Sequence, residues 1–330
     1  MKAIFIRTHG GPEVLQLEDM PVPLPQHAEV LVKNQAIGVN FVDTQHRAGL
    51  NYPVNLPLIP GTEAAGVVQA VGPQVSEFKV GDRVGYAGYM GGDYAEYTLV
   101  PQDRLVPIPT QVTFEAAAAA LMQGMTAHCL AYSVYPIKPG DTVLVQAAGS
   151  GVGLFLVQLA RRRGATVIAV VSSPEKAELA RAMGAEHVIV HTQTDFESET
   201  LRLTHGEGVQ AVYDSVGRST FDKGINVLKA QGYMIVYGLT SGPVPPFDIN
   251  RLSGITGANS KGSLFLTWAT LSDYNARRED LLWRARDVLG WIADGSLKVH
   301  IARSLPLADA AEAHRLVESR QLTGKVLLLP

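Results

Sequence analysis

The sequence has 330 residues, of which 46% are hydrophobic and 18% are charged, so it can bury a sizeable core and is not a disordered chain. Its 28 Lys and Arg residues face 31 Asp and Glu residues, and a formal net charge of −3 provides no long-range attraction for nucleic acid or an anionic membrane. The one cysteine, Cys129, excludes an internal disulfide and thiolate-rich metal sites, and it favours a reducing cytoplasm.

Neither the start of the chain nor its apolar stretches predict a membrane or export segment. The N-terminus is apolar for only a few residues before Arg7, which is too short for a signal peptide. The uncharged stretches 116–137 and 142–160 approach the length of a membrane span, but polar residues interrupt the first and glycines the second. We therefore expect a protein that is neither exported nor inserted in a membrane.

The first hundred or so residues predict an irregular β-rich unit. Short runs rich in β-branched residues alternate with Gly and Pro, a texture typical of short strands joined by turns. These runs are Glu29–Lys33, Gly66–Gly72, Gly81–Tyr86 and Tyr94–Val100.

From about Phe114 the pattern changes to an Ala-rich helix followed by alternating strands and helices. Ser173-Pro174-Glu175 has the capping hydroxyl, the proline and the acid that start a helix, and Gly164 and Gly184 are placed to end helices. The predicted strands are Thr142–Ala147, Thr166–Val171, His187–Val190, Val209–Tyr213, Tyr233–Tyr237 and Ser263–Thr267. Six strands alternating with helices predict an α/β fold with a doubly wound parallel sheet.

The remaining tail is too long to be only a cap on that sheet. It contains a helical stretch from Arg278 to Asp294, the segment Leu297–Ile301, a helix around Ala308–Ser319 and the strand-like run Lys325–Leu329. The last run needs a partner strand, and the N-terminal β unit is the most economical one. We therefore expect the α/β domain to be inserted between two parts of the β-rich domain.

A glycine-rich segment, Gln146–Leu154, lies between the first strand of the alternation and its helix. A helix N-terminus at this place offers free N–H groups and a favourable dipole to a pyrophosphate. If Gly153 is the glycine needed for close helix–strand packing, the two preceding glycine positions of the usual pattern hold Ala148 and Ser150. The motif alone is weak, but the six-strand alternation around it favours dinucleotide binding.

The end of the second strand bears on the choice of dinucleotide. A carboxylate there would bind a ribose 2′-hydroxyl and repel a 2′-phosphate, whereas this sequence has Ser172, Ser173 and Lys176. These residues favour NADPH over NADH. Two alternatives stay open: Ser173 and Lys176 serve the helix alone, or Glu175 points inward and reverses the preference.

The sequence contains no motif typical of a zinc site or of a serine hydrolase. The nine histidines show no paired spacing typical of a zinc site, and there is no second cysteine. The sequence has no G-x-S-x-G elbow, because Ser150 belongs to the glycine-rich turn. His128 and Cys129 lie side by side in an apolar helix and are interpreted as core residues.

Several segments together resemble the zinc-independent medium-chain dehydrogenase/reductases, specifically the NADPH:quinone oxidoreductase, or zeta-crystallin-like, family. The resemblance runs from end to end of the chain. In zinc-bearing relatives the place of Asn40 holds a cysteine ligand and that of Thr62 a histidine. The resembling segments are Gly38–Asp43, Pro60–Gly66, Gln123–Ala127, the glycine-rich turn, Val212–Gly217, Lys261–Leu264 and Glu318–Arg320.

This resemblance implies a GroES-like catalytic domain over residues 1–122, an NADP-binding Rossmann domain over 123–267 and a return to the catalytic domain over 268–330. It implies a homodimer that pairs through the edge strand Ser263–Thr267. It also implies Asn40 and Thr126 at the nicotinamide, Gly151 and Val152 under the pyrophosphate, Ser172, Lys176 and Arg320 at the 2′-phosphate, and Leu239, Phe265 and Leu266 at the carboxamide. Two departures are His191 in place of an expected tyrosine at the 2′-phosphate and Gln45 in place of a substrate-side tyrosine, which leaves Tyr52 as the aromatic residue there.

The implied activity is metal-free reduction of a quinone by NADPH. A quinone needs no dedicated proton donor, because its ring delocalises the charge, so positioning and exclusion of water would carry catalysis. We expect Asn40 and Tyr52 to hydrogen-bond the acceptor carbonyl and Asp43 to be structural. One- and two-electron reduction both stay open. Reduction of the C=C bond of a 2-alkenal or enone and an NADPH-binding structural or RNA-binding role are the alternatives, although no aromatic and basic platform for RNA is present.

Overall fold

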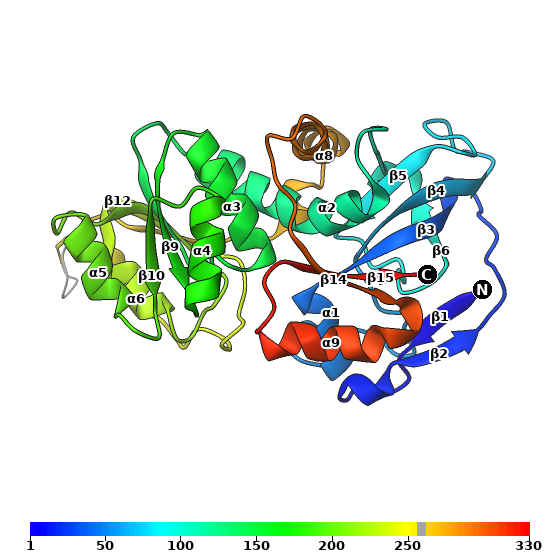
Figure 1. The fold of residues 1–330 in the computed structure, drawn as a ribbon, viewed down its shortest axis with the longest axis horizontal. Helices are drawn as coiled ribbons and strands as arrows, with labels where there is room; N and C mark the ends of the chain where they lie inside the picture. The colour runs from blue at the N-terminus through cyan, green and yellow to red at the C-terminus, as the bar shows by residue number, and fades with distance from the viewer. Residues whose placement is uncertain (256–261) are drawn as a thin grey trace. The chain divides into compact units, whose positions relative to one another are not determined.

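The computed structural model describes residues 1–255 and 262–330. The chain divides into two compact units: unit 1 combines Met1–Met125 with Asn275–Pro330, and unit 2 is Thr126–Tyr274. Figure 1 colours the chain from its N-terminus to its C-terminus. Lys261, one of the residues on which the predicted resemblance rests, lies outside the described residues. Among the described helices, none combines the length and the apolar character that a membrane crossing requires.

Unit 1 is built on a β-sheet in which the C-terminal strand lies beside an N-terminal one. The order is β14-β15-β3-β4-β5-β7, with β6 also paired to β3, while β1 (Lys2–Phe5) and β2 (Gln16–Asp19) form a separate antiparallel pair. The sheet strands are β3 (Glu29–Val39), β4 (Glu63–Val71), β5 (Arg83–Ala87), β6 (Tyr97–Pro101), β7 (Val106–Pro107), β14 (Ile301–Pro306) and β15 (Lys325–Leu329). The antiparallel pairing of β15 with β3 confirms that the tail returns to the N-terminal β unit.

Four longer helices belong to unit 1 in whole or in part: α1 (Phe41–Ala48), α2 (Phe114–Cys129), α8 (Arg278–Ala293) and α9 (Ala310–Ser319). The division between the units falls within α2. The core of unit 1 joins buried side chains of β3, β4 and β15 to Ala310 and Ala313 of α9. Helix α9 thus lies close to the sheet and to α1, as Figure 1 shows.

Unit 2 contains the predicted six-stranded sheet, in which all neighbouring pairs are parallel. The strand order is β10-β9-β8-β11-β12-β13. The strands are β8 (Thr142–Val145), β9 (Thr166–Val171), β10 (His187–Val190), β11 (Val209–Asp214), β12 (Leu228–Val236) and β13 (Phe265–Trp268). The chain starts at β8 and winds outward in both directions, which confirms a doubly wound α/β fold.

The helices of unit 2 follow from that winding. Helix α3 (Gly151–Arg162) packs on β8 and β9, α4 (Pro174–Ala182) packs on β9 and β10, and α5 (Phe196–Leu203) lies beside α6 (Phe221–Asn226). Because crossovers between parallel strands are right-handed, the two directions of winding place α3 and α4 on one face and α5 and α6 on the other. A π-helical turn over Leu130–Val134 extends α2, and α7 (Leu271–Tyr274) ends the unit.

Several predicted boundaries need correction, and strand β8 ends at Val145 instead of Ala147. Strand β13 begins at Phe265 instead of Ser263, because Ser263 has a φ of 46°, in the left-handed region outside the extended conformation of a regular strand. Strand β12 begins at Leu228, five residues before the predicted start. Strand β14 begins at Ile301, where the segment Leu297–Ile301 ends, and its mostly exposed side chains show no apolar alternation that the sequence could reveal.

Candidate active site

The glycine-rich turn of unit 2 lies where β8 ends and α3 begins. Ser150 is the N-cap of α3, and its hydroxyl accepts a hydrogen bond from the Gly153 N–H at 3.3 Å. A Cβ on Gly153 would lie 2.5 Å from the Ala147 carbonyl oxygen and 2.7 Å from the Ala148 Cα, so only glycine fits. The close-packing role predicted for Gly153 is confirmed. The N–H groups of Gly151 and Val152 belong to the first turn, where helices leave such donors without intrahelical partners.

The end of β9 brings Ser172 and Lys176 together. The Lys176 ammonium donates to the Ser172 hydroxyl at 3.2 Å, and the Lys176 N–H donates to the Ser173 hydroxyl at 3.4 Å, so Ser173 is the N-cap of α4. Half-burial of its side chain lowers the pKa of Lys176. The aliphatic part of Lys176 runs beside Gly149, where a Cβ would lie 3.0 Å from that of the lysine. The lysine therefore links the glycine-rich turn to the end of β9.

The Glu175 side chain does not join Ser172 and Lys176 at the end of β9. Its side chain is fully exposed, and the hydrogen bond with Ser173 lowers its pKa, so it stays a carboxylate at the start of α4. The segment that follows β10 lies beside Ser172, because the Thr192 hydroxyl donates to the Ser172 carbonyl at 3.3 Å. His191 follows β10 with an exposed side chain, and its N–H donates to the Val171 carbonyl at 2.9 Å.

Asp214 organises the loop after β11, a role that the sequence analysis missed. One carboxylate oxygen accepts the N–H groups of Val216 at 2.6 Å and Gly217 at 3.1 Å, and the other accepts the Thr220 hydroxyl at 2.8 Å. Burial is the largest influence on Asp214 and raises its pKa, while these three hydrogen bonds act in the opposite direction. An acid directly after a buried strand and three residues before a glycine was the available signal.

The remaining predicted residues of unit 2 lie on separate elements. Thr126 is a partly buried residue of α2, and Leu239 follows β12, where its side chain approaches Gly217. Phe265 stacks on Tyr233 with ring centroids 4.4 Å apart, yet it remains 47% exposed, and Leu266 is 39% exposed. These two side chains leave an apolar surface on β13.

In unit 1, Asn40 lies at the junction of β3 and α1. Its N–H donates to the Asp43 carboxylate at 2.8 Å. Its side chain contacts two buried charged groups, the Lys325 ammonium at 2.7 Å and the Glu63 carboxylate at 3.1 Å. Lys325 and Glu63 also form an ion pair with an N···O distance of 2.6 Å. The sequence analysis missed both, although a charged residue at the start of an apolar strand is a signal in each case.

Asp43 has no exposed surface and joins Asn40 to a deeper set of polar residues. It accepts hydrogen bonds from the Thr62 hydroxyl at 3.0 Å and the Tyr94 hydroxyl at 3.2 Å. Burial raises the pKa of Asp43 to about 6, although the Asn40 N–H, the Lys325 charge and the two hydroxyls lower it. Asp43 and Thr62 thus contact Asn40 and are almost completely buried.

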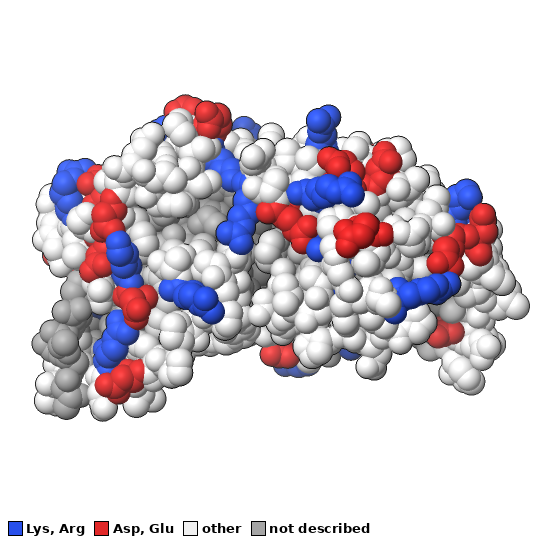
Figure 2. Space-filling view, turned by 90° about the horizontal axis from the view of Figure 1, so that it is seen from below, with Lys and Arg blue, Asp and Glu red and all other residues white. Residues whose placement is uncertain are grey.

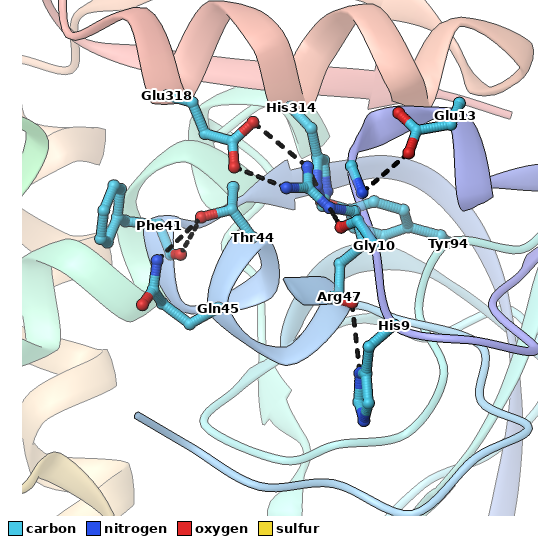
Figure 3. A network of polar contacts seen from close by, with 11 residues as sticks. His9, Gly10, Glu13, Phe41, Thr44, Gln45, Arg47, Tyr94, His314 and Glu318 are labelled. Carbon is cyan, nitrogen blue, oxygen red and sulfur yellow. Dashed lines mark hydrogen bonds and ion pairs between the residues drawn. The ribbon is translucent and has the colours of Figure 1, made fainter. Parts of the chain in front are cut away.

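Figure 3 shows how this set continues from α1 to α9. The Arg47 guanidinium donates to His314 Nδ1 at 3.2 Å and to the Glu318 carboxylate at 2.6 and 3.2 Å. Because arginine can only donate, His314 Nδ1 carries the lone pair and Nε2 carries the hydrogen, which faces the Tyr94 hydroxyl at 3.0 Å. Burial, reinforced by the Arg47 charge, lowers the pKa of His314 to about 3. A chain of hydrogen bonds therefore connects Glu318 to Asp43.

Tyr52 and Arg320 follow the two helices that this network joins, α1 and α9. Tyr52 follows α1, meets His46 edge-on with ring centroids 6.3 Å apart, and has its pKa raised by partial burial. An open hollow of about 530 Å³ is lined by Pro53, Val54 and Asn55, which follow Tyr52 in the sequence, and by Met90. Arg320 ends α9 in a left-handed conformation with a φ of 57° and has an exposed side chain.

The residues in the places of zinc ligands form hydrogen bonds with each other. Asn40 Nδ2 lies 3.4 Å from the Thr62 hydroxyl, and Thr62 donates to Asp43. Across residues 1–255 and 262–330, no three His, Cys, Asp or Glu side chains gather in a way that could hold a metal ion. Cys129 is buried and forms no disulfide.

Comparison with known proteins identifies the family. Residues 26–110 match the alcohol dehydrogenase GroES-like domain, and residues 151–278 match the zinc-binding dehydrogenase family. A quinone oxidoreductase of Pseudomonas aeruginosa is 40% identical over 329 residues, covering 100% of this chain and 99% of that protein. A 2-haloacrylate reductase of a Burkholderia species is 37% identical over 333 residues, covering 99% and 98%.

A solved structure gives the same result. The Escherichia coli quinone oxidoreductase complexed with NADPH superposes with a TM-score of 0.94 at 39% identity, and the match covers 100% of both chains. The chain therefore belongs to the medium-chain dehydrogenase/reductases, within the zeta-crystallin-like quinone oxidoreductase family. It is an oxidoreductase, as the sequence predicted.

Proposed function

We propose that this enzyme uses NADPH to reduce a quinone without a metal ion. The observation that carries the NADPH part is the contact of Lys176 with Ser172 beside the glycine-rich turn. A cation and a hydroxyl at this strand end suit a 2′-phosphate, and the exposed Glu175 does not compete with them. The NADPH complex of the Escherichia coli relative supports the same cofactor.

The proposed cofactor contacts are those that the family resemblance implies. Residues 123–267 form the NADP-binding domain, in which Gly151 and Val152 hold the pyrophosphate and Ser172, Lys176 and His191 adjoin the 2′-phosphate. Arg320 adds a second cation for that phosphate. Thr126, Asn40, Leu239, Phe265 and Leu266 contact the nicotinamide end. The fit rests on the cradle at Gly153, where the backbone approaches too closely for any other residue.

NADPH, when bound, supplies a hydride equivalent to the acceptor. The chain's own contribution is to bind and orient the acceptor: Asn40 and Tyr52 donate hydrogen bonds to its carbonyl oxygen. A donor held in place before the reaction stabilises the negative charge that develops on that oxygen. Neither residue has to transfer a proton, because the aromatic product of a quinone delocalises the charge.

A C=C reductase acting on enones or enals is the second candidate. The 37% identical Burkholderia relative, a 2-haloacrylate reductase, favours it. An RNA-binding role gains no such support, because on the face drawn in Figure 2 the Lys and Arg side chains alternate with Asp and Glu and do not form a cationic patch.

We also propose a homodimer through β13 and a cytoplasmic location. The cytoplasmic location is supported by the lack of a second cysteine for a disulfide.

The test is a panel of quinones, enals and 2-haloacrylate, each mixed with enzyme and NADPH while absorbance at 340 nm is followed. Turnover of quinones supports the proposal, and turnover of the alkenes alone assigns the second function. Exhaustive chelation should leave the rate unchanged. Loss of activity that zinc restores would contradict the metal-free mechanism.

A further inference from the structure

The Asn40 amide is part of a closed triangle of hydrogen bonds with two buried charges. The Lys325 ammonium donates to Asn40 Oδ1 at 2.7 Å, Asn40 Nδ2 donates to Glu63 Oε2 at 3.1 Å, and Lys325 donates to the same Glu63 oxygen at 2.6 Å. Lys325 is 1% exposed and Glu63 has no exposed surface. Glu63 and Lys325 begin the strands β4 and β15, which both pair with β3, and Asn40 directly follows β3.

The register of the sheet brings the three residues together. Val39 of β3 faces Val326 of β15, so the next pair outward is Asn40 with Lys325. Ile37 of β3 faces Ala64 of β4, so Glu63 comes beside Gly38. A Cβ on Gly38 would lie 2.5 Å from the Glu63 carboxylate and 2.8 Å from the Lys325 Cε, so the ion pair occupies the space that a side chain would need.

The triangle determines which end of the amide points where. If the Asn40 amide turned over, its NH₂ group would face the Lys325 ammonium and its oxygen would face the Glu63 carboxylate. Two hydrogen bonds to charged partners would become two repulsive contacts in a buried setting, where such contacts are costly. Lys325 and Glu63 thus allow one amide orientation and exclude the other.

In that orientation one amide hydrogen is directed at Glu63, while the second has only long contacts within the protein. Asn40 Nδ2 lies 3.3 Å from the Gly38 carbonyl and 3.4 Å from the Thr62 hydroxyl. The ammonium bound to the amide oxygen also draws electron density away from the nitrogen, which strengthens the remaining N–H as a donor. A donor of this kind suits an oxygen that gains negative charge.

We propose that Lys325 and Glu63 are positioning residues that hold the Asn40 amide with an N–H, and not its oxygen, presented to the carbonyl oxygen of the acceptor. This inference rests on the proposed function for the role of Asn40 as an acceptor contact. It adds two residues to the site and assigns a function to a buried ion pair, a feature that by itself is weak evidence for a role in stability.

The experiment compares wild type with the Lys325→Met, Glu63→Gln and double Lys325→Met/Glu63→Gln variants. The double variant leaves no unpaired buried charge, so it remains testable if a single variant fails to fold. Arg284→Met is the matched control: Arg284 is a 2% exposed cation of α8 that pairs with Asp280 of the same helix. Each protein is measured for thermal unfolding, NADPH affinity, and kcat and KM for the accepted substrate.

A second measurement does not depend on turnover. The side-chain NH₂ signals of Asn40, in protein labelled with ¹⁵N on asparagine and assigned by their loss in Asn40→Ser, report the amide directly. We expect one slowly exchanging pair in wild type and in Arg284→Met. In the double variant we expect these signals to shift and to exchange at least tenfold faster, with kcat/KM for the acceptor reduced about 10- to 100-fold and NADPH affinity changed less than threefold.

The outcomes separate the positioning role from a structural one. A folded double variant with unchanged Asn40 signals, or with unchanged kcat/KM, would overturn the proposal, because the pair would then stabilise the sheet alone. If wild type reduces no quinone or alkene, the proposed function fails, but the amide signals still show whether Lys325 and Glu63 hold Asn40. Shifted Asn40 signals in the double variant, together with its loss of acceptor turnover, would support both the positioning role and the proposed function.

Discussion

At the scale of single residues, Lys176 carries the proposed preference for NADPH. Its ammonium already lies 3.2 Å from the Ser172 hydroxyl, and its stem lines the glycine-rich turn. Lys176→Glu should weaken NADPH binding by about 1–3 kcal/mol, because a charge-assisted hydrogen bond to phosphate is replaced by repulsion. Titration of cofactor fluorescence measures this change, with NADH as the companion ligand.

The matched control for this prediction is Lys138→Glu, which makes the same change of charge at an exposed residue before the amino end of β8. Its NADPH affinity should stay at the wild-type value. Equal NADPH affinities of the Lys176→Glu and control proteins would place Lys176 in solvent when NADPH is bound. Equal wild-type affinities for NADPH and NADH would contradict the cofactor preference itself.

At the scale of elements, the start of α3 depends on the absence of a side chain at Gly153. In Gly153→Ala the new Cβ would meet backbone atoms at 2.5 and 2.7 Å, so β8 and α3 would have to separate. Overpacking of this kind costs about 1–3 kcal/mol. We expect a lower unfolding free energy in urea together with weaker NADPH binding.

Gly290 of α8 provides the opposite case. No atom lies within 4 Å of a Cβ built there, and the residue is inside a helix. Gly290→Ala should therefore stabilise the protein by up to about 1 kcal/mol, since alanine loses less backbone freedom than glycine on folding. If both alanine variants destabilised the protein equally, close packing would not be the reason for Gly153.

The link between α1 and α9 should be visible in the pH dependence of stability. The pKa of His314 is lowered from 6.5 to about 3, so between these values the unfolded chain binds more protons than the folded one. The contribution of neutral His314 is present above pH 6.5 and is lost as the pH falls. Asp43, whose pKa is raised from 3.8 to about 6, acts in the opposite direction: its contribution is lost as the pH rises from 3.8 to 6.

Replacing His314 should remove one of these two opposing effects. His314→Gln keeps an acceptor for Arg47 and a donor for Tyr94, but it does not titrate. From pH 7 to pH 5 the unfolding free energy of this variant should rise relative to wild type by about 2 kcal/mol, measured by urea unfolding. Asp43→Asn should change the pH dependence with the opposite sign. A profile parallel to wild type in His314→Gln would mean that the histidine is accessible to protons in the folded state.

The sequence could predict the local features of the site but not the contacts between distant segments. The glycine-rich turn and the Ser173 cap were readable, because their partners lie within a few residues. The network in Figure 3 was not, since Arg47 and His314 are separated by 267 positions and neither belongs to a recognisable motif. The return of β15 to the N-terminal sheet was predicted, whereas its register with β3, which brings Lys325 to Asn40, is set by packing.

At the scale of the whole molecule, the edge strand β13 bears on the oligomeric state. It pairs with β12 on one side, and among the described residues no strand pairs with its other edge. Phe265, Leu266 and Trp268 are 47%, 39% and 47% exposed, which is a large apolar surface for so short a strand. An open apolar edge invites another strand. In the proposed homodimer, a second copy of β13 would satisfy both its backbone groups and its apolar side chains.

The double variant Leu266→Lys/Trp268→Lys should abolish the proposed homodimer, because charged side chains on an edge strand oppose pairing. Light scattering after size exclusion should give a dimer mass for wild type and a monomer mass for the variant. Leu24→Lys is the control, since Leu24 is 79% exposed and belongs to unit 1, whereas β13 belongs to unit 2. A monomeric wild type at all concentrations, or a variant that stays dimeric, would show that β13 is not the interface. If the variant is monomeric with full NADPH affinity, the cofactor site is complete within one chain.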